Sequence, residues 1–202
     1  MGESRHDTKP VLRSRLRRAR NGLDAEVARR LAASACARAN ELEVVRRSRD
    51  LLAYAACDGE IDPGVTVAVA LGAGKTVYHP ALEDDALRFR RSRPDELRPG
   101  RRGVPEPAAG ASLPGDGTGA VVLVPGVAFD VAGGRLGRGG GHYDRVLCGI
   151  PAAVRVGLAY ELQLLPVVPT DEWDVDVDYI VTEARVIATE ARRATRRKEM
   201  RA

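Results

Sequence analysis

The segment Ala120–Val124 (AVVLV), together with the glycine-rich stretch behind it, constrains the fold more than any other part of the chain. Five consecutive apolar residues closed by Pro125–Gly126 predict a short buried strand. The glycines then lead to His142, where a helix is expected to begin. A strand, a loop and a helix in this order are typical of α/β proteins, in which helices cover a central sheet.

Further helices and strands alternate along the rest of the chain. Apolar residues at helical spacing predict a helix from Lys9 or Pro10, and Asp24 is expected to cap a second one. A third helix is expected to open at Asp62 or Pro63. The stretch from Arg93 to Gly119 is rich in proline, glycine and charge and predicts a long surface loop. The remaining predicted strands are Asp50–Ala56, Lys75–His79 (stopped by Pro80), Val154–Leu158 and Asp178–Val181.

Strands separated by helical segments favour parallel pairing. We therefore predict a single three-layer α/β domain over residues 1–185, with a mainly parallel central sheet flanked by helices. Residues 186–202 are interpreted as a basic C-terminal tail.

Composition narrows the functional classes. The 202 residues contain 44% hydrophobic and 30% charged residues, and no apolar run approaches the ~20 residues of a membrane helix. Three scattered cysteines and a polar N-terminus without a secretory pattern favour the cytoplasm. The formal net charge is +4 and aromatic residues make up 4% of the chain. The basic residues gather at the two ends, so nucleic-acid binding is the weaker alternative and no nucleic-acid or membrane partner is predicted.

The segment Arg135–Arg145 (RLGRGGGHYDR) contains the residues that indicate a binding site. Glycines let backbone N–H groups approach a ligand, and a helix N-terminus behind them favours an anion. Arg135 and Arg138 can bind phosphate oxygens, and Asp144 is where Mg²⁺ would be held. The pattern is neither a Walker A loop nor a dinucleotide fingerprint. It predicts a site for a nucleoside triphosphate; the alternative is a flexible surface loop with incidental charges.

The same segment resembles the RLGxGxGYYDR signature of the 5-formyltetrahydrofolate cyclo-ligases, also called 5,10-methenyltetrahydrofolate synthetases. This resemblance implies a fold similar to the NagB/RpiA/CoA-transferase group. Five further segments resemble parts of the family pattern in the same order: KPVLR at Lys9–Arg13, Asp58–Glu60, GVPEP at Gly103–Pro107, VPGVAFD at Val124–Asp130, and Pro169–Thr182.

The resemblance implies an ATP- and Mg²⁺-dependent cyclisation of 5-formyltetrahydrofolate, a reduced folate, to 5,10-methenyltetrahydrofolate, with ADP and phosphate released. The formyl oxygen attacks the γ-phosphate, the neighbouring folate nitrogen adds to the activated carbon, and phosphate leaves. A monomer or weak homodimer is expected.

Site residues follow from the matched motifs. Arg135, Arg138 and Tyr143 are implied as catalytic residues. Ala55 and Glu60 are implied as substrate-binding residues, and Asp144 and Asp178 as magnesium ligands. The ATP-binding residues are implied to be Lys9, Pro10, Val11, Leu12, Arg13, Arg135, Leu136, Gly137, Arg138, Gly139, Gly140, Gly141, His142 and Tyr143.

The chain departs from the family pattern at five positions. Many members carry lysine where this chain has Gly140, an aromatic residue in place of His142 or Arg102, a basic residue in place of Ala81, and histidine in place of Trp173. The motifs that are implied to bind ATP thus match the family pattern better than the motifs that are implied to bind the folate. The alternative function is therefore a cyclo-ligase-like enzyme that uses ATP to activate a non-folate formamide or amide.

Overall fold

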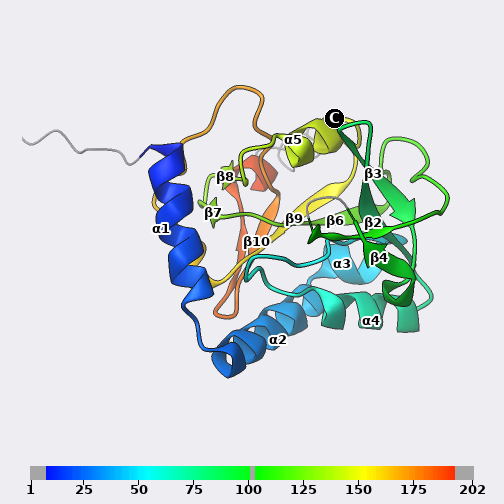
Figure 1. Ribbon diagram of the computed structural model, residues 1–202, viewed down its shortest axis with the longest axis horizontal. Coiled ribbons are helices and arrows are strands. Elements are labelled where there is room, and N and C mark those ends of the chain that lie inside the picture. Colours follow the sequence, from blue (N-terminus) through cyan, green and yellow to red (C-terminus); the bar gives the residue numbers. More distant parts are fainter. Residues whose placement is uncertain (1–7, 101–102, 194–202) are drawn as a thin grey trace, which may run out of the picture.

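A computed structural model describes residues 8–100 and 103–193 of the chain. Its centre is a seven-stranded sheet in the order β11-β10-β9-β6-β1-β2-β3, in which the five inner strands are parallel and the two outer ones antiparallel (Figure 1). The sheet strands are β1 (Asp50–Leu52), β2 (Thr76–Glu83), β3 (Ala86–Arg91), β6 (Ala120–Val124), β9 (Val154–Leu158), β10 (Tyr179–Val181) and β11 (Val186–Ala188). The helices are α1 (Lys9–Asn21), α2 (Ala25–Glu41), α3 (Glu43–Arg47), α4 (Gly64–Gly72) and α5 (His142–Cys148).

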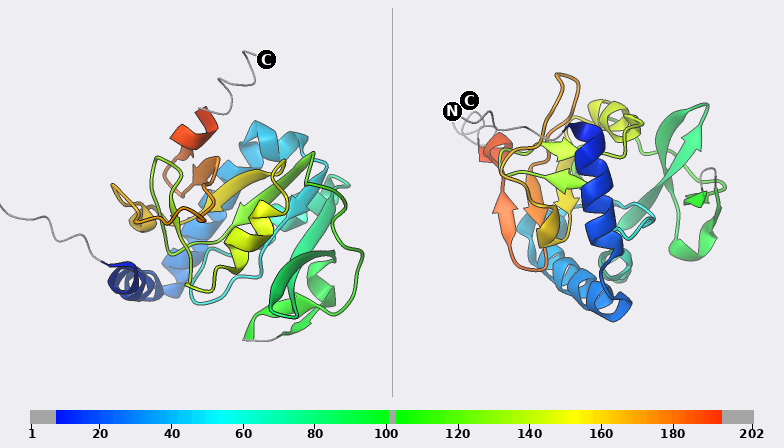
Figure 2. Two further views of the ribbon diagram at one scale, coloured as in Figure 1. Left: turned by 90° about the horizontal axis from the view of Figure 1, so that it is seen from above. Right: turned by 60° about the vertical axis from the view of Figure 1, so that its left-hand side comes forward.

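Helices cover both faces of the sheet. In β6, Val121 and Leu123 belong to the apolar cluster formed with α2, α3 and α4. Val122 and Val124 point to the other face, where they share a cluster with Leu147 of α5. Figure 2 shows α5 and the blue and cyan helices on opposite sides of the strands. The predicted three-layer α/β fold is confirmed, and a strand with two covered faces explains the uninterrupted apolar run.

Helix α1 begins where the sequence predicts, with a proline in its first turn. Leu12 and Leu16 pack against a small hairpin of β7 (Ala128–Phe129) and β8 (Arg135–Leu136). This hairpin follows β6 directly, so α1 lies beside the loop that leads to α5. The predicted Asp24 cap of α2 is also confirmed, because Oδ1 accepts from the N–H groups of Glu26 and Val27 at 2.9 and 3.1 Å.

Two strand predictions are corrected. The strand predicted at Asp50–Ala56 pairs only over Asp50–Leu52. Pro80 does not stop the next strand, since β2 continues through it to Glu83 and pairs with β3. Within the sheet, β1 pairs with β2 only as far as Tyr78. Beyond that point β2 has one neighbour, and a residue without an N–H is tolerated there.

The sheet extends past its predicted limit, and the predicted long loop contains short elements of secondary structure. Val186–Ala188 forms β11, antiparallel to β10, so the sheet includes residues beyond Arg185. The stretch from Arg93 to Gly119 contains a short 3₁₀ helix (Pro94–Glu96) and a two-stranded hairpin of β4 (Leu97–Pro99) and β5 (Pro105–Pro107). Arg102 lies outside the described residues. In the part of the chain that the structure describes, no helix is long and apolar enough to cross a membrane.

Phe129 fixes the path of the chain after β6. Its ring is fully buried between two glycines. A Cβ at Gly126 would lie 2.5 Å from the ring, and one at Gly157 would lie 2.6 Å from it. Both distances are shorter than real Cβ contacts allow, so the ring sits where only hydrogen atoms can face it. The turn that leads into the glycine loop is thereby held against β9.

Candidate active site

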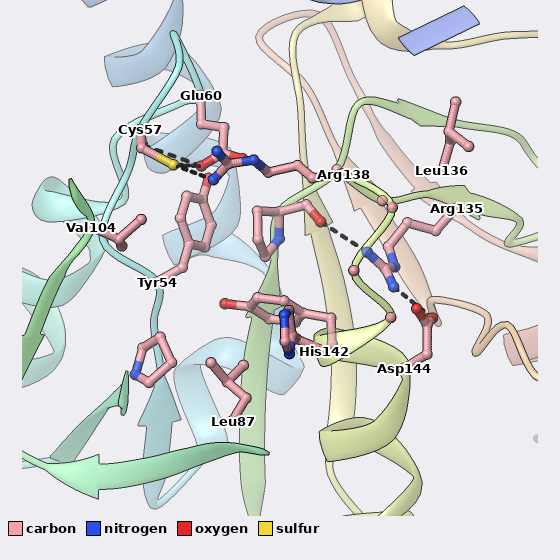
Figure 3. A pocket seen from close by; sticks show the side chains of 18 of the residues that line it. Tyr54, Cys57, Glu60, Leu87, Val104, Arg135, Leu136, Arg138, His142 and Asp144 are labelled. Carbon is pink, nitrogen blue, oxygen red and sulfur yellow. Dashed lines mark hydrogen bonds and ion pairs between the residues drawn. The ribbon is translucent and has the colours of Figure 1, made fainter. Parts of the chain in front are cut away.

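A cavity of about 460 Å³ opens where the carboxyl ends of β1 and β6 meet. The chain crosses from β1 to β2 on one side and from β6 to β9 on the other, so the strand order reverses between β1 and β6. Open α/β sheets bind ligands at such a point. Figure 3 shows the cavity between the loop after β1, which carries Cys57 and Glu60, and the glycine loop before α5.

The glycine loop forms one wall of the cavity. Two of its glycines adopt backbone conformations that other residues rarely adopt. Gly139 has a φ of 104° and Gly141, the N-cap of α5, has a φ of 64°. Both values lie in the left-handed region that favours glycine. Arg13 donates from Nε to the carbonyl oxygen of Gly137 at 2.9 Å, which fastens the loop to α1.

Helix α1 presents a basic stripe to the cavity. Lys9, Arg13 and Arg17 are spaced by four residues and all line it, as expected for one face of a helix. The structure does not bring Pro10 and Val11 to the cavity; both are exposed. The intervening Leu12 is also absent from the lining, because its side chain is buried under the helix.

Arg135 is held by a buried ion pair. Its Nη2 lies 2.6 Å from Oδ1 of Asp144, and the two side chains are 3% and 15% exposed. Nη1 also donates to the carbonyl oxygen of Pro125 at 3.3 Å, and the guanidinium lies 5.9 Å from the ring centre of Tyr143. Asp144 Oδ1 accepts in addition from the N–H of Val175 at 3.3 Å. The pair fixes the first turn of α5 and braces the loop.

Arg138 reaches across the cavity to the opposite loop. Its Nη1 lies 2.8 Å from Sγ of Cys57 (Figure 3). Glu60 Oε2 accepts from the backbone N–H of Cys57 at 3.2 Å. The pKa of the Cys57 thiol is raised to about 11 by burial and by the Glu60 carboxylate. Arg138 thus connects the glycine loop with the loop after β1 across the cavity.

Glu60 is a partly buried carboxyl group at the cavity wall. Burial raises its pKa, against the hydrogen bond from Cys57 and the nearby Arg20 and Arg138. The Tyr143 hydroxyl is buried without a hydrogen-bond partner among the described residues, and burial followed by the Glu60 charge raises its pKa. Polar groups of this kind, gathered at one wall of a cavity, mark a ligand site.

The loop before β10 closes the side of the cavity next to α1. Lys9 Nζ lies 2.6 Å from Oδ2 of Asp171 and 2.8 Å from Oδ2 of Asp174. These contacts join positions more than 160 residues apart in the sequence. The Lys9 ammonium faces two carboxylates, whereas Arg13 and Arg138 form no ion pair within the described ranges.

Asp178 is not brought to the cavity. It precedes β10, and its Oδ2 accepts from the N–H of Arg155 at 2.8 Å. Because the inner strands are parallel, their amino ends lie at the opposite edge of the sheet from the glycine loop. Asp174, four residues earlier, does line the cavity. In the described residues no cluster of three or more histidine, cysteine or acidic side chains forms a complete metal site.

Most of the remaining predicted site residues line the cavity. The cavity lining includes Ala55, Glu60, Tyr143 and all residues from Arg135 through Asp144. Ala81 is buried and lies between Pro80 and Leu82, which both line the cavity, so its side chain faces the other way. The cavity-lining residues that were not predicted as site residues are Arg17, Tyr54, Cys57, Pro80, Leu82, Leu87, Val104, Glu106, Pro125, Gly126, Asp171, Trp173 and Asp174.

Comparisons with known proteins agree with this geometry. The family model of the 5-formyltetrahydrofolate cyclo-ligase family matches residues 5–183. The 5-formyltetrahydrofolate cyclo-ligase of Haemophilus influenzae is 33% identical over 81% of this chain and 91% of its own length. That of Escherichia coli K12 is 32% identical over 85% of this chain and 98% of its own.

Solved structures give the same result. The 5,10-methenyltetrahydrofolate synthetase of Aquifex aeolicus superimposes with a TM-score of 0.79 at 32% identity, covering 89% of this chain and 92% of its own. The synthetase of Mycoplasma pneumoniae has a TM-score of 0.70 at 20% identity over 88% of this chain and 99% of its own, and supports the fold alone. With the glycine loop, the basic stripe of α1 and the partly buried Glu60 around one cavity, the chain belongs to the 5-formyltetrahydrofolate cyclo-ligase family.

Proposed function

We propose that the protein catalyses the ATP-dependent cyclisation of 5-formyltetrahydrofolate to 5,10-methenyltetrahydrofolate, with release of ADP and phosphate. One observation carries the proposal: a single cavity is lined by the glycine loop and Arg13 on one side and by Glu60 on the other. A reaction between a nucleotide phosphate and a second substrate requires both subsites to open into the same space.

On the phosphate side, loop N–H groups and guanidinium groups offset the charge of the triphosphate. Arg13 and Arg138 are cations of this wall that form no ion pair with a carboxylate among the described residues. Arg135 has a different part, because its guanidinium is committed to Asp144 and Pro125. It holds the loop in shape, and a loop that is already shaped stabilises developing charge without reorganising.

The cavity also fits Mg²⁺ bound together with a nucleotide. Asp144 is 15% exposed, and only its Oδ1 is engaged by Arg135 and Val175. Asp174 adds a second carboxylate at the same wall. Mg²⁺ is usually held by one or two carboxylates plus substrate phosphates, so a full protein cage is not needed. We propose Asp144 and Asp174 as its ligands, Asp174 replacing Asp178. The ion would supply positive charge beside the phosphates.

On the substrate side, Glu60 would accept hydrogen bonds from the folate ring, beside Ala55. The apolar wall opposite, made by Leu82, Leu87 and Val104, suits a flat ring system. The formyl oxygen would attack the γ-phosphorus as ADP leaves. The neighbouring nitrogen would then add to the activated carbon and lose its proton, and the carbon–oxygen bond would break with release of phosphate.

The test is a direct assay of purified protein with 5-formyltetrahydrofolate, ATP and Mg²⁺, following the absorbance of the methenyl product. Turnover that requires all three supports the proposal. A folded protein that binds ATP but gives no product would contradict it. That outcome would favour the alternative, ATP-dependent activation of a non-folate formamide or amide, which the departures at Gly140 and His142 motivate.

We also propose that the enzyme works in the cytoplasm as a monomer or weak homodimer. The family membership and the single substrate cavity within one chain support this assignment. Sedimentation velocity over a range of protein concentrations tests the oligomeric state.

A further inference from the structure

Trp173 is an exposed aromatic side chain at the cavity wall. It is the single tryptophan of the chain, its side chain lines the cavity, and the residue is 65% exposed. The other large hydrophobic side chains exposed in the described part of the chain are all valines. Covering an exposed indole is favourable, and ligand pockets are commonly lined by aromatic side chains.

The loop that carries Trp173 is firmly anchored. Asp171 and Asp174, which precede and follow Trp173 in the sequence, both form ion pairs with Lys9. The two aspartates also form a turn, in which Asp171 N–H donates to Asp174 Oδ2 at 2.8 Å and Asp174 N–H donates to Asp171 O at 3.0 Å. Val175 then donates to Asp144. The exposed ring is therefore held on an ordered turn.

The position of this turn indicates which ligand the ring would meet. In Figure 1 the orange loop before β10 arches between the N-terminal end of α1 and α5. Its contacts run to Lys9 and Asp144, on the phosphate side of the cavity. The substrate side, with Glu60 and Val104, is formed by other loops. A nucleotide combines a flat neutral ring with an anionic chain that can reach the glycine loop, as this position requires.

We propose that Trp173 is the base-stacking residue of the nucleotide subsite, with its indole packed on the purine ring of ATP. The inference rests on the proposed use of ATP but not on the identity of the second substrate. Stacking is tolerant of base identity, because every base presents a π-face. Trp173 would therefore strengthen nucleotide binding while discriminating weakly between ATP and GTP.

Tryptophan fluorescence, excited where the five tyrosines do not absorb, tests the proposal without any turnover, since Trp173 is the single tryptophan. ADP with Mg²⁺ should change the emission of the wild-type protein. Inorganic tripolyphosphate, which fills a phosphate site but has no ring, should change it little and should compete with ADP. Equal spectral changes with ADP and tripolyphosphate would overturn base stacking.

Substitutions provide a second test. Trp173→Ala should raise the Kd for ADP and the KM for ATP about tenfold, with the Kd for tripolyphosphate and the KM for the folate unchanged. Trp173→Phe, which keeps a ring, should recover most of the affinity. Val167→Ala is the matched control, because Val167 is 68% exposed in the same connection and does not line the cavity.

The outcomes separate this inference from the proposed function. ADP binding that depends on Trp173, in a protein without folate turnover, would contradict the proposed function and support stacking. Turnover in which Trp173→Ala raises the KM for the folate, and not for ATP, would overturn stacking on the nucleotide and support the proposed function.

Discussion

Asp58 Oδ2 lies 2.6 Å from Nε of Arg17, and this ion pair fastens α1 to the loop that carries Glu60. Asp58 also accepts from Nδ2 of Asn21 at 3.0 Å and from Nη2 of Arg20 at 3.1 Å. The side chain of Arg20 is 1% exposed, so its charge depends on this carboxylate. Asp58 therefore sets the distance between the basic stripe of α1 and the loop after β1 that carries Glu60.

Asp58→Asn should destabilise the protein by roughly 2–3 kcal/mol, because it removes the carboxylate that forms an ion pair with the buried Arg20. Asparagine tolerates the left-handed backbone at this position, where φ is 54°, so the loss would report charge rather than strain. Urea unfolding measures the effect. Glu43→Gln is the control: its pair with Arg47 is exposed on both sides, and its loss should cost about 0.5 kcal/mol or less. Equal effects of the two substitutions would contradict the prediction.

The phosphate-side cations should contribute unequally to ATP binding. Arg13→Ala should raise the KM for ATP more than Lys9→Met does, because the Lys9 charge is already opposed by Asp171 and Asp174. Charge-assisted contacts of this kind are worth about 1.5–3 kcal/mol, or roughly tenfold to a hundredfold in affinity. Steady-state kinetics at saturating folate measures it, and a larger effect of Lys9→Met would refute the ranking.

Magnesium dependence should follow Asp144 and Asp174, not Asp178. Asp174→Asn should raise the Mg²⁺ concentration needed for half-maximal turnover by at least tenfold, a typical effect of weakening a metal site. Asp178→Asn should leave it unchanged, because its carboxylate accepts from Arg155 N–H away from the cavity and an amide oxygen can replace it. A magnesium requirement that moves with Asp178 would restore the original sequence prediction.

Acid should destabilise the fold through His79. This side chain in β2 is 3% exposed, and burial lowers its pKa from 6.5 to about 4. The unfolded chain therefore binds a proton that the folded chain does not between these values. The histidine's stabilising effect is complete above pH 6.5 and is lost as the pH falls toward 4, by roughly 3 kcal/mol in total.

Urea unfolding of wild type and His79→Gln at several pH values isolates this effect. The difference in unfolding free energy between the two proteins should shrink as the solution is acidified. Parallel pH curves would show that another group is responsible.

Local patterns predicted the parts of the site that are continuous in sequence. The glycine loop, the start of α1 and the strand before the loop depend on neighbouring residues, and the structure has them where the motifs indicate. The family and the fold were predicted correctly for the same reason. Lys9 and Arg13 reach the cavity because a helix places every fourth residue on one face.

The missed residues depend on contacts between distant segments. Nothing around Cys57 indicates that Arg138, 81 residues later, lies against its thiol. The choice between Asp174 and Asp178 depends on where the preceding loop turns, and both lie in one acidic segment. Pro80 misled the strand prediction because its tolerance depends on the lack of a neighbouring strand beyond Tyr78.

The burial of Phe129 between Gly126 and Gly157 sets a rule for how this chain can evolve. The side chains at the three positions share one limited space, because a methyl group at either glycine would collide with the Phe129 ring. A chain that gains alanine at position 126 or 157 should therefore also carry a smaller residue at position 129. Positions 126 and 157 lie on different segments. Related sequences should therefore vary together at these positions and at 129, because the turn after β6 packs closely against β9.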